Sequence, residues 1–279
     1  MKFVDVKNDV AFRKIFGNEK KKIILTSFLN AVLDLKQSKR INEVILLNPY
    51  QLPRIIGEKS SIIDVKATDG DGSTFIIEMQ VAEPEELDKR VLYYTSKEYA
   101  AQINSGDDYP KLRPVYFIGI LNFSYFPNVN YFSTHLLTEQ ETGQCLLQDL
   151  QFRFIELTKF KKKSNELKTI IDKWTFFTKN AKNLDIIPEN LDDEGLKEAY
   201  QAAAEYNWSK EEFDDYIKVG MREQDERGRI TLAEKKSAEN TRDEMIVSMF
   251  SQGIPMETIS KISKLDEETI IKIIQSRKV

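Results

Sequence analysis

The stretch SIIDVKATDGDGSTFIIEMQ, residues 61–80, sets the first restriction on the fold of this chain. Two runs rich in β-branched residues flank the turn DGDGS at residues 69–73, a composition typical of a β-hairpin. Each run also carries an acidic residue, Asp64 in the first and Glu78 in the second. Because burying an unpaired carboxylate costs several kcal/mol, two neighbouring strands that both carry one need a compensating partner.

Strand geometry predicts where these two carboxylates lie. If Thr68 and Thr74 close the hairpin, Asp64 lies directly opposite Glu78 on the same face. Opposed Cβ atoms on neighbouring strands are roughly 5 Å apart, so the two charges repel unless a cation lies between them. Carboxylate pairs of this kind suit Mg²⁺ or Mn²⁺. Two alternatives stay open: a solvated sheet face without a role for the acids, and a one-residue slip that moves Glu78 to the other face.

Composition narrows the class of protein. A chain of 279 residues with 41% hydrophobic residues can form one or two globular domains. Its net charge of −4 gives no global basic signature, so a site for a polyanion must be a local patch. The single Cys145 excludes an intrachain disulfide framework, and the single His135 excludes a multi-histidine metal site. With no signal-peptide core and no run of 18 apolar residues, we expect a cytoplasmic protein without a membrane partner.

The pattern along the chain predicts an order of elements for the first half. A short helix begins at the N-cap Asn8 and ends at Gly17, and a second helix follows at residues 20–35. The further expected elements are a strand at residues 41–50, the acidic hairpin, a helix at residues 84–104, a strand at residues 113–123, and strands near residues 131–137 and 152–157.

Five motifs in this order carry a family resemblance: NDVAFRKIFG at residues 8–17, DVKATDGDG at 64–72, IEMQ at 77–80, KRVLYY at 89–94 and RPVYFIGIL at 113–121. With them the chain resembles the PD-(D/E)XK nuclease superfamily, and within it the Rpn family of recombination-promoting nucleases, also described as transposases. The resemblance covers roughly residues 5–160. It implies an α/β fold with a restriction-endonuclease-like core, a mixed central sheet flanked by helices, followed by an α-helical C-terminal region.

The resemblance also implies a set of site residues. The superfamily's Asp and Glu correspond to Asp64 and Glu78, and its last motif position, usually Lys, is Gln80 here. The two carboxylates and the carbonyl of Met79 would hold Mg²⁺ or Mn²⁺, which activates a water for attack on a phosphodiester. Gln80 can orient that water, but it carries no charge.

Further acidic and basic residues are candidates for the same site. Lys66 could supply the missing positive charge, or it could be an ordinary solvated strand lysine. Asp9, or less favourably Glu19, could be the extra acidic residue that the superfamily places on its first helix. The alternative for Asp9 is a first-turn residue favoured by the helix dipole.

Two residues of the helix at residues 84–104 are candidate substrate contacts. Arg90 would bind a phosphate near the cleavage site, supported by Tyr94. The alternative is that Arg90 pairs with Glu86 while the tyrosine packs structurally. A lysine-rich run at residues 161–163 could also touch phosphate, although a solvated charge run is the simpler interpretation.

The pattern of the second half of the sequence predicts helices. We expect a nuclease-like domain at residues 1–160, a helical extension at 161–229, a polar helical or flexible linker at 230–253 and a helix-turn-helix-like tail at 254–279. Two short helices in the tail share an apolar stripe, and Asp266 can cap the second. Because two helices cannot bury that stripe alone, we expect a partner, in the first place a second copy of the chain. The stripe consists of Met256, Ile259, Ile262, Leu265, Ile270 and Ile273.

The sequence therefore favours a metal-dependent DNA endonuclease that hydrolyses phosphodiester bonds and is linked to recombination or transposition. A catalytically weak, transposon-associated DNA-binding protein with a nuclease-derived scaffold is the alternative. A toxin or defence component that acts on RNA is a third, weaker hypothesis. Intact Asp64 and Glu78 favour the enzyme.

Overall fold

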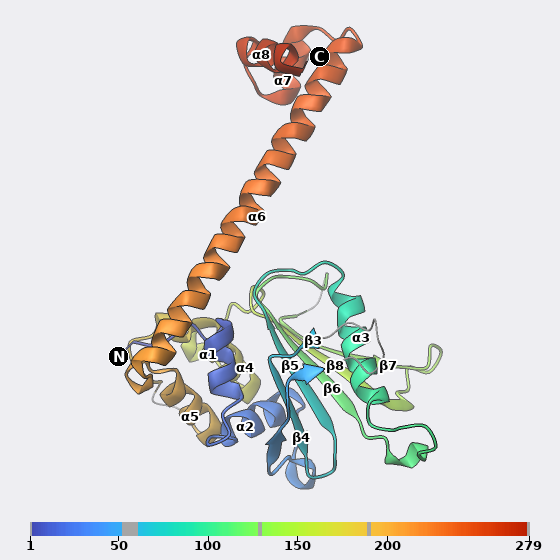
Figure 1. The fold of residues 1–279 in the computed structure, drawn as a ribbon, viewed down its shortest axis with the longest axis vertical. Helices are drawn as coiled ribbons and strands as arrows, with labels where there is room; N and C mark the ends of the chain where they lie inside the picture. Colours follow the sequence, from blue (N-terminus) through green and yellow to red (C-terminus); the bar gives the residue numbers. More distant parts are fainter. Residues whose placement is uncertain (1, 52–60, 128–129, 189–190, 278–279) are drawn as a thin grey trace. The chain divides into compact units, whose positions relative to one another are not determined.

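A mixed sheet with helices on both faces forms the core of the structure, a computed structural model that describes residues 2–51, 61–127, 130–188 and 191–277. The chain divides into two units, Met1–Val219 and Gly220–Val279. The first unit has the α/β architecture expected from the sequence, and the second is helical (Figure 1).

The six-stranded sheet of the first unit has the strand order β1-β4-β5-β6-β8-β7. Its central strands β5, β6 and β8 are parallel, while β4 and β1 on one side and β7 on the other are antiparallel to their neighbours. β6 is buried along nearly its whole length, as its run of apolar residues predicts. The strands are β1 (Val44–Leu46), β4 (Val65–Asp69), β5 (Thr74–Gln80), β6 (Val115–Leu121), β7 (Phe132–Leu137) and β8 (Leu147–Glu156); β2 (Tyr50–Gln51) and β3 (Ser61–Ile62) form a separate antiparallel pair.

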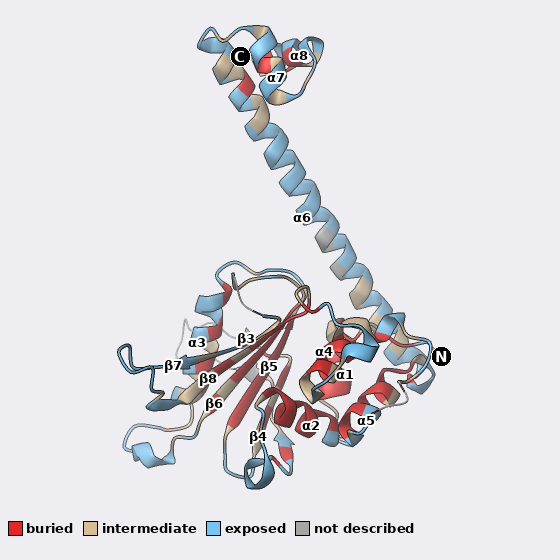
Figure 2. Cartoon of the chain, turned by 180° about the vertical axis from the view of Figure 1, so that it is seen from behind, coloured by how far each residue is buried: buried red, intermediate tan, exposed pale blue. Residues whose placement is uncertain are grey.

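Helices cover the two faces of the sheet unequally. One face packs against α1 (Asp9–Phe16), α2 (Ile23–Val32), α4 (Ile170–Asn180) and α5 (Glu194–Ala203), and the other packs against α3 (Leu87–Ala100). Alternation along β5 follows this division, because Ile77 and Met79 belong to the larger core and Ile76 belongs to the core under α3. Figure 2 shows both buried layers in red. Short 3₁₀ helices lie at Gln37–Lys39, Tyr109–Lys111, Ser164–Glu166, Ala181–Asn183 (η4) and Glu205–Asn207.

The first helix begins and ends as its sequence predicts. The Asn8 side chain accepts hydrogen bonds from the N–H groups of Val10 and Ala11, which have no partner inside the helix. Gly17 ends the helix, and its N–H donates to the carbonyl of Arg13. These local signals fix the helix that carries Asp9.

The observed division of the chain differs from the boundaries expected from the sequence. We expected a separate helical extension to begin at residue 161, but α4 and α5 pack into the core of the first unit. Trp174 of α4 is fully buried, and its ring centroid lies 5.5 Å from that of Phe28 and 5.8 Å from that of Phe16. These aromatic contacts join α4 to α1 and α2, and residues 161–219 belong to the first unit.

The second unit contains most of the 42-residue helix α6 (Lys210–Ser251), together with α7 (Met256–Ser263) and α8 (Glu267–Arg277). The polar segment that we expected to be a helix or a linker is helical. Asp266 precedes α8, and its Oδ1 accepts a hydrogen bond from the N–H of Thr269 at 2.8 Å, as predicted. Among the described residues, every helix is too short or too polar to cross a bilayer.

The apolar stripe of the tail packs against a helix of the same chain. The expectation that the stripe needs a second copy of the chain to cover it was therefore wrong. Ile259 and Ile270 are fully buried against Ile246, near the C-terminal end of α6. Three helices therefore bury what two could not. Ile262 does not join this core and remains 61% exposed.

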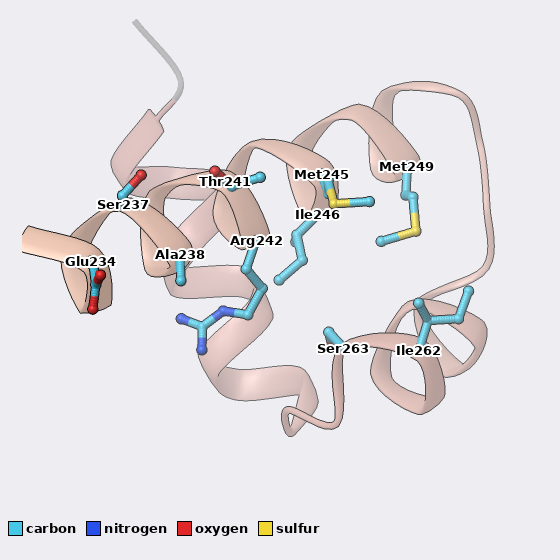
Figure 3. Close-up of a pocket in the computed structure, with 10 residues that line it drawn as sticks. All are labelled: Glu234, Ser237, Ala238, Thr241, Arg242, Met245, Ile246, Met249, Ile262 and Ser263. Carbon is cyan, nitrogen blue, oxygen red and sulfur yellow. The ribbon is translucent and has the colours of Figure 1, made fainter. Parts of the chain in front are cut away.

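An open groove lies between α6 and α7 (Figure 3). Ala238, Met245 and Met249 line it from α6, and Ile262 lines it from α7. Glu234 and Arg242 contribute charged groups to the same lining. The exposed part of the stripe thus forms one wall of this groove.

A pair of isoleucines on α7 tests the assignment of the tail core. Ile259→Ala should lower the free energy of unfolding of the second unit by about 2–4 kcal/mol, because it leaves a cavity at a fully buried position. Ile262→Ala on the same helix is the matched control and should change it by less than about 0.5 kcal/mol. Hydrogen exchange of α7 and α8 measures both effects, and equal losses of protection would contradict the assigned core.

Candidate active site

The β4–β5 hairpin brings the two predicted carboxylates together. Thr68 pairs with Thr74 and Val65 pairs with Ile77, so the expected register is confirmed. Asp64 directly precedes β4, and its Oδ2 accepts a hydrogen bond of 2.9 Å from the N–H of Met79 on β5. This bond attaches the Asp64 carboxylate to the strand that carries Glu78.

Glu78 is buried in a way that leaves one of its oxygens unsatisfied. The residue is 6% exposed, and its Oε2 accepts a hydrogen bond of 2.9 Å from Nε2 of Gln80. Its Oε1 is buried and has no hydrogen-bond partner among the described residues. Burial, followed by the negative charge of Asp64, raises the pKa of Glu78 from 4.5 to about 8. A cation at this position would relieve both effects.

Arg13 of α1 lies beside Asp64. Its Nη2 and Nε donate to Oδ1 of Asp64 at 2.8 and 3.2 Å. Burial lowers the pKa of Arg13, but the hydrogen bond to Asp64 and the negative charges of Asp64, Asp9 and Glu78 raise it, and the net shift is upward. Arg13 was not among the site residues predicted from the sequence. Its spacing of four residues from Asp9, which puts both on one helix face, was the available signal.

Asp9 lies in the same electrostatic environment, whereas the alternative Glu19 does not. Burial and then the charge of Asp64 raise the pKa of Asp9, and the charge of Arg13 opposes the shift. Glu19 lies beyond the end of α1, is exposed, and pairs with Lys22 at 3.2 Å. Of the two acidic candidates near the first helix, Asp9 is the one close to Asp64.

A small cavity between β5, β6 and α3 brings Glu78 together with the other predicted residues Gln80, Arg90 and Tyr94. The positive charge of Arg90 opposes the upward shift in the pKa of Glu78. The guanidinium carbon of Arg90 lies 5.8 Å from the ring centroid of Tyr94. Glu86, the alternative partner for Arg90, has its carboxylate 2.6 Å from Nζ of Lys89.

Lys66 points toward α3 and forms an ion pair there. Its Nζ lies 2.7 Å from Oε1 of Glu98, and the two side chains are only 14% and 11% exposed. This largely buried ion pair shows that Lys66 is not an ordinary solvated strand lysine. Lys66 could supply a positive charge to Asp64 and Glu78 only if its pair with Glu98 were broken.

Gly119 provides the space beside Glu78. It pairs with Glu78 in the parallel β5–β6 register. A Cβ atom at this position would lie 2.8 Å from Cδ1 of Phe154, closer than real side chains approach. The strand next to Glu78 therefore needs a residue without a side chain.

The residues present fit a hard divalent cation. The N–H of Met79 points toward Asp64, and the two polar backbone groups of a strand residue point to the same edge, so its carbonyl faces that edge too. The next carbonyl, that of Gln80, faces the opposite edge and accepts from the N–H of Asn122 at 2.9 Å. In the part of the chain that the structure describes, no group of three or more His, Cys, Asp or Glu side chains could hold a metal. Two carboxylates and one carbonyl instead match a cation such as Mg²⁺, which keeps several waters.

The buried carboxyl makes stability depend on pH. A carboxyl whose pKa is raised on folding stabilises the fold below its unfolded pKa, and that contribution is lost as pH rises through the folded value, here from 4.5 to about 8. Glu78→Gln cannot ionise, so its free energy of unfolding should not show this loss. The difference in free energy of unfolding between Glu78→Gln and the wild type should therefore be about 2–5 kcal/mol larger, in favour of the variant, at pH about 9 than at pH about 4.

Urea unfolding without divalent metal at both pH values measures this difference. Glu85→Gln, the same substitution at an exposed position two residues before α3, is the control and should follow the wild type at both pH values. Parallel pH dependence in the wild type and Glu78→Gln would show that Glu78 is not buried as described.

A family model described as PD-(D/E)XK nuclease family transposase matches residues 6–233. No curated protein and no solved structure matches the chain. The matched segment includes every residue of the candidate site, from Asp9 on α1 to Tyr94 on α3.

Proposed function

The chain belongs to the family of PD-(D/E)XK nuclease transposases, and on this premise we propose that it is a Mg²⁺-dependent DNA endonuclease acting in recombination or transposition. The observation that carries the proposal is the buried carboxylate of Glu78, whose Oε1 has no partner among the described residues while Asp64 lies beside it. Burying such a group is unfavourable unless a ligand completes the site.

In this proposal each side chain of the site has a separate role in hydrolysis. Asp64, Glu78 and the carbonyl of Met79 would hold the cation. A bound divalent cation supplies polarisation of the scissile phosphate and a water of lowered pKa. The amide of Gln80, which donates to Glu78 in the structure, would orient the attacking water. Arg90, on the wall of the same cavity, binds the phosphate, supported by Tyr94.

Arg13 and Asp9 have supporting roles. The two hydrogen bonds from Arg13 fix the orientation of the Asp64 carboxylate, so we assign Arg13 as a positioning residue. Asp9 interacts electrostatically with Asp64 and would be the additional acidic residue of the site.

A specific observation supports the alternative of a weakly active DNA-binding protein. The usual lysine of the motif is Gln80 here, and Lys66 is held by Glu98. The positive charges near the carboxylates therefore come from Arg13 and Arg90, which lie on helices rather than on the acidic strands. Action on RNA is the third alternative, and cleavage assays with both nucleic acids separate the three.

Location and assembly are parts of the same proposal. We propose that the protein acts in the cytoplasm, as expected from the sequence. Self-association through the tail would use the exposed groove residues Met245 and Ile262, because most of the apolar stripe is buried within the chain.

Plasmid cleavage tests the catalytic assignment. Asp64→Ala and Glu78→Gln should each lower Mg²⁺-dependent cleavage by more than about 100-fold, because each weakens or removes a metal ligand. Asp71→Ala removes an exposed carboxylate from the turn of the same hairpin and should cleave like the wild type. Wild-type cleavage by either site variant, with folding checked by circular dichroism, would refute the assignment.

The position of Gln80 gives a second test. Gln80→Lys restores the residue common in the superfamily and should retain or increase the cleavage rate, whereas Gln80→Ala should lower it by a factor on the order of 10 or more. Single-turnover rates at saturating Mg²⁺ compare the three proteins. Unchanged rates in both variants would mean that Gln80 does not contact the attacking water.

A further inference from the structure

Four lysines from separate segments gather beside the N-terminus of α1. We call Lys7, Lys161, Lys179 and Lys182 the lysine cluster. Nζ of Lys7 donates to the carbonyl of Lys179 on α4 at 3.4 Å. Nζ of Lys179 donates in turn to the carbonyl of Phe160, which directly precedes Lys161, at 2.6 Å. These bonds connect the chain before α1, the segment after β8, and α4.

The lysine cluster keeps a local excess of positive charge on a chain whose net charge is negative. Asp5 offsets part of it, since its carboxylate lies 2.6 Å from Nζ of Lys7 and 3.7 Å from Nζ of Lys182. Burial and then the charges of Lys161 and Lys7 lower the pKa of Lys179, so the amines still repel one another. An anion would relieve this repulsion.

One residue of the lysine cluster lies close along the chain to the candidate active site. Lys7 precedes Asp9 by two residues, a separation that spans at most about 7 Å of chain. Asp9 in turn interacts electrostatically with Asp64. In Figure 1, α1 and α4 lie side by side, consistent with the contact between Lys7 and Lys179.

The exposure of the four amines fits the binding of an extended polyanion. Lys7 and Lys179 are partly buried, and backbone carbonyls hold them in place. Lys161 and Lys182 are exposed, and the side chain of Lys182 is 57% accessible. Lys7 and Lys179 therefore contribute positive charge at fixed positions. Lys161 and Lys182 can extend toward separate phosphates. Lysine contacts of this kind position a nucleic acid without reading its sequence.

We propose that the lysine cluster binds the phosphates of duplex DNA that flank the scissile bond. This inference rests on the proposed function, because duplex DNA is the polyanion that the neighbouring phosphodiester site would act on. With its phosphates bound by the lysine cluster, the DNA strand would run past the N-terminus of α1 toward Asp64 and Glu78.

The salt dependence of binding tests the inference with the full-length protein. Fluorescence anisotropy of a labelled DNA duplex, in EDTA to prevent cleavage, gives the affinity over a series of KCl concentrations. Lys161→Gln/Lys182→Gln should weaken binding by about tenfold or more and make the slope of log affinity against log salt shallower by about two.

A second double variant controls for total charge. Lys20→Gln/Lys39→Gln removes the same two charges from exposed positions elsewhere in the first unit and should leave affinity and slope near wild type. An equal loss in the two double variants would overturn the inference, and so would a cluster variant that binds like the wild type.

Metal-dependent cleavage, measured in parallel, separates this inference from the proposed function. If DNA binding depends on the lysine cluster but no cleavage occurs, the DNA-binding role of the lysine cluster is supported and the proposed nuclease activity is refuted. Cleavage by a wild type whose binding does not depend on the lysine cluster supports the nuclease alone. A wild type that binds no DNA refutes both, and cluster-dependent binding of an RNA duplex in place of DNA overturns the assigned partner.

Discussion

The antiparallel pairing of β4 with β5 forces two acidic side chains into one place, and the surrounding elements compensate for their charge. The pairing of Thr68 with Thr74 leaves Asp64 no position other than beside β5. From one side α1 brings Arg13 to Asp64, and from the other α3 covers Glu78 and brings Arg90 near it. Helices α1 and α3 thus each contribute both apolar contacts and a positive charge.

The two carboxylates experience different environments despite their proximity. Asp64 accepts hydrogen bonds from a guanidinium and from a backbone N–H, whereas Glu78 accepts one from a neutral amide and is left with a buried, unpaired oxygen. Pairs of titratable groups in unequal environments are characteristic of sites at which chemistry or ligand binding occurs. A hairpin with a solvated acidic face would show two similar, exposed carboxylates, so the structure argues against that alternative.

Much of the fold was predictable because it depends on short-range patterns. The hairpin register, the Asn8 cap and the Asp266 cap each follow from residues within one turn or one hairpin. The contact of Arg13 with Asp64 joins residues 51 apart, and the ion pair of Lys66 with Glu98 joins a strand to a helix. Neither side chain has a local signal for its partner. The tail core was missed because Ile246 follows a long polar segment that resembles a linker.

The order of the strands has a consequence for how the first unit folds. β4 and β5 are joined by a short turn and can pair early, whereas β5 must wait for β6, which begins at residue 115. Helix α3 lies within that intervening segment, so the hairpin can bring Asp64 and Glu78 together before α3 covers Glu78. At that stage water still solvates both charges and their repulsion is weak. Full desolvation of Glu78 is therefore a late event, and its free-energy cost should slow the final docking of α3 rather than the first step of chain collapse.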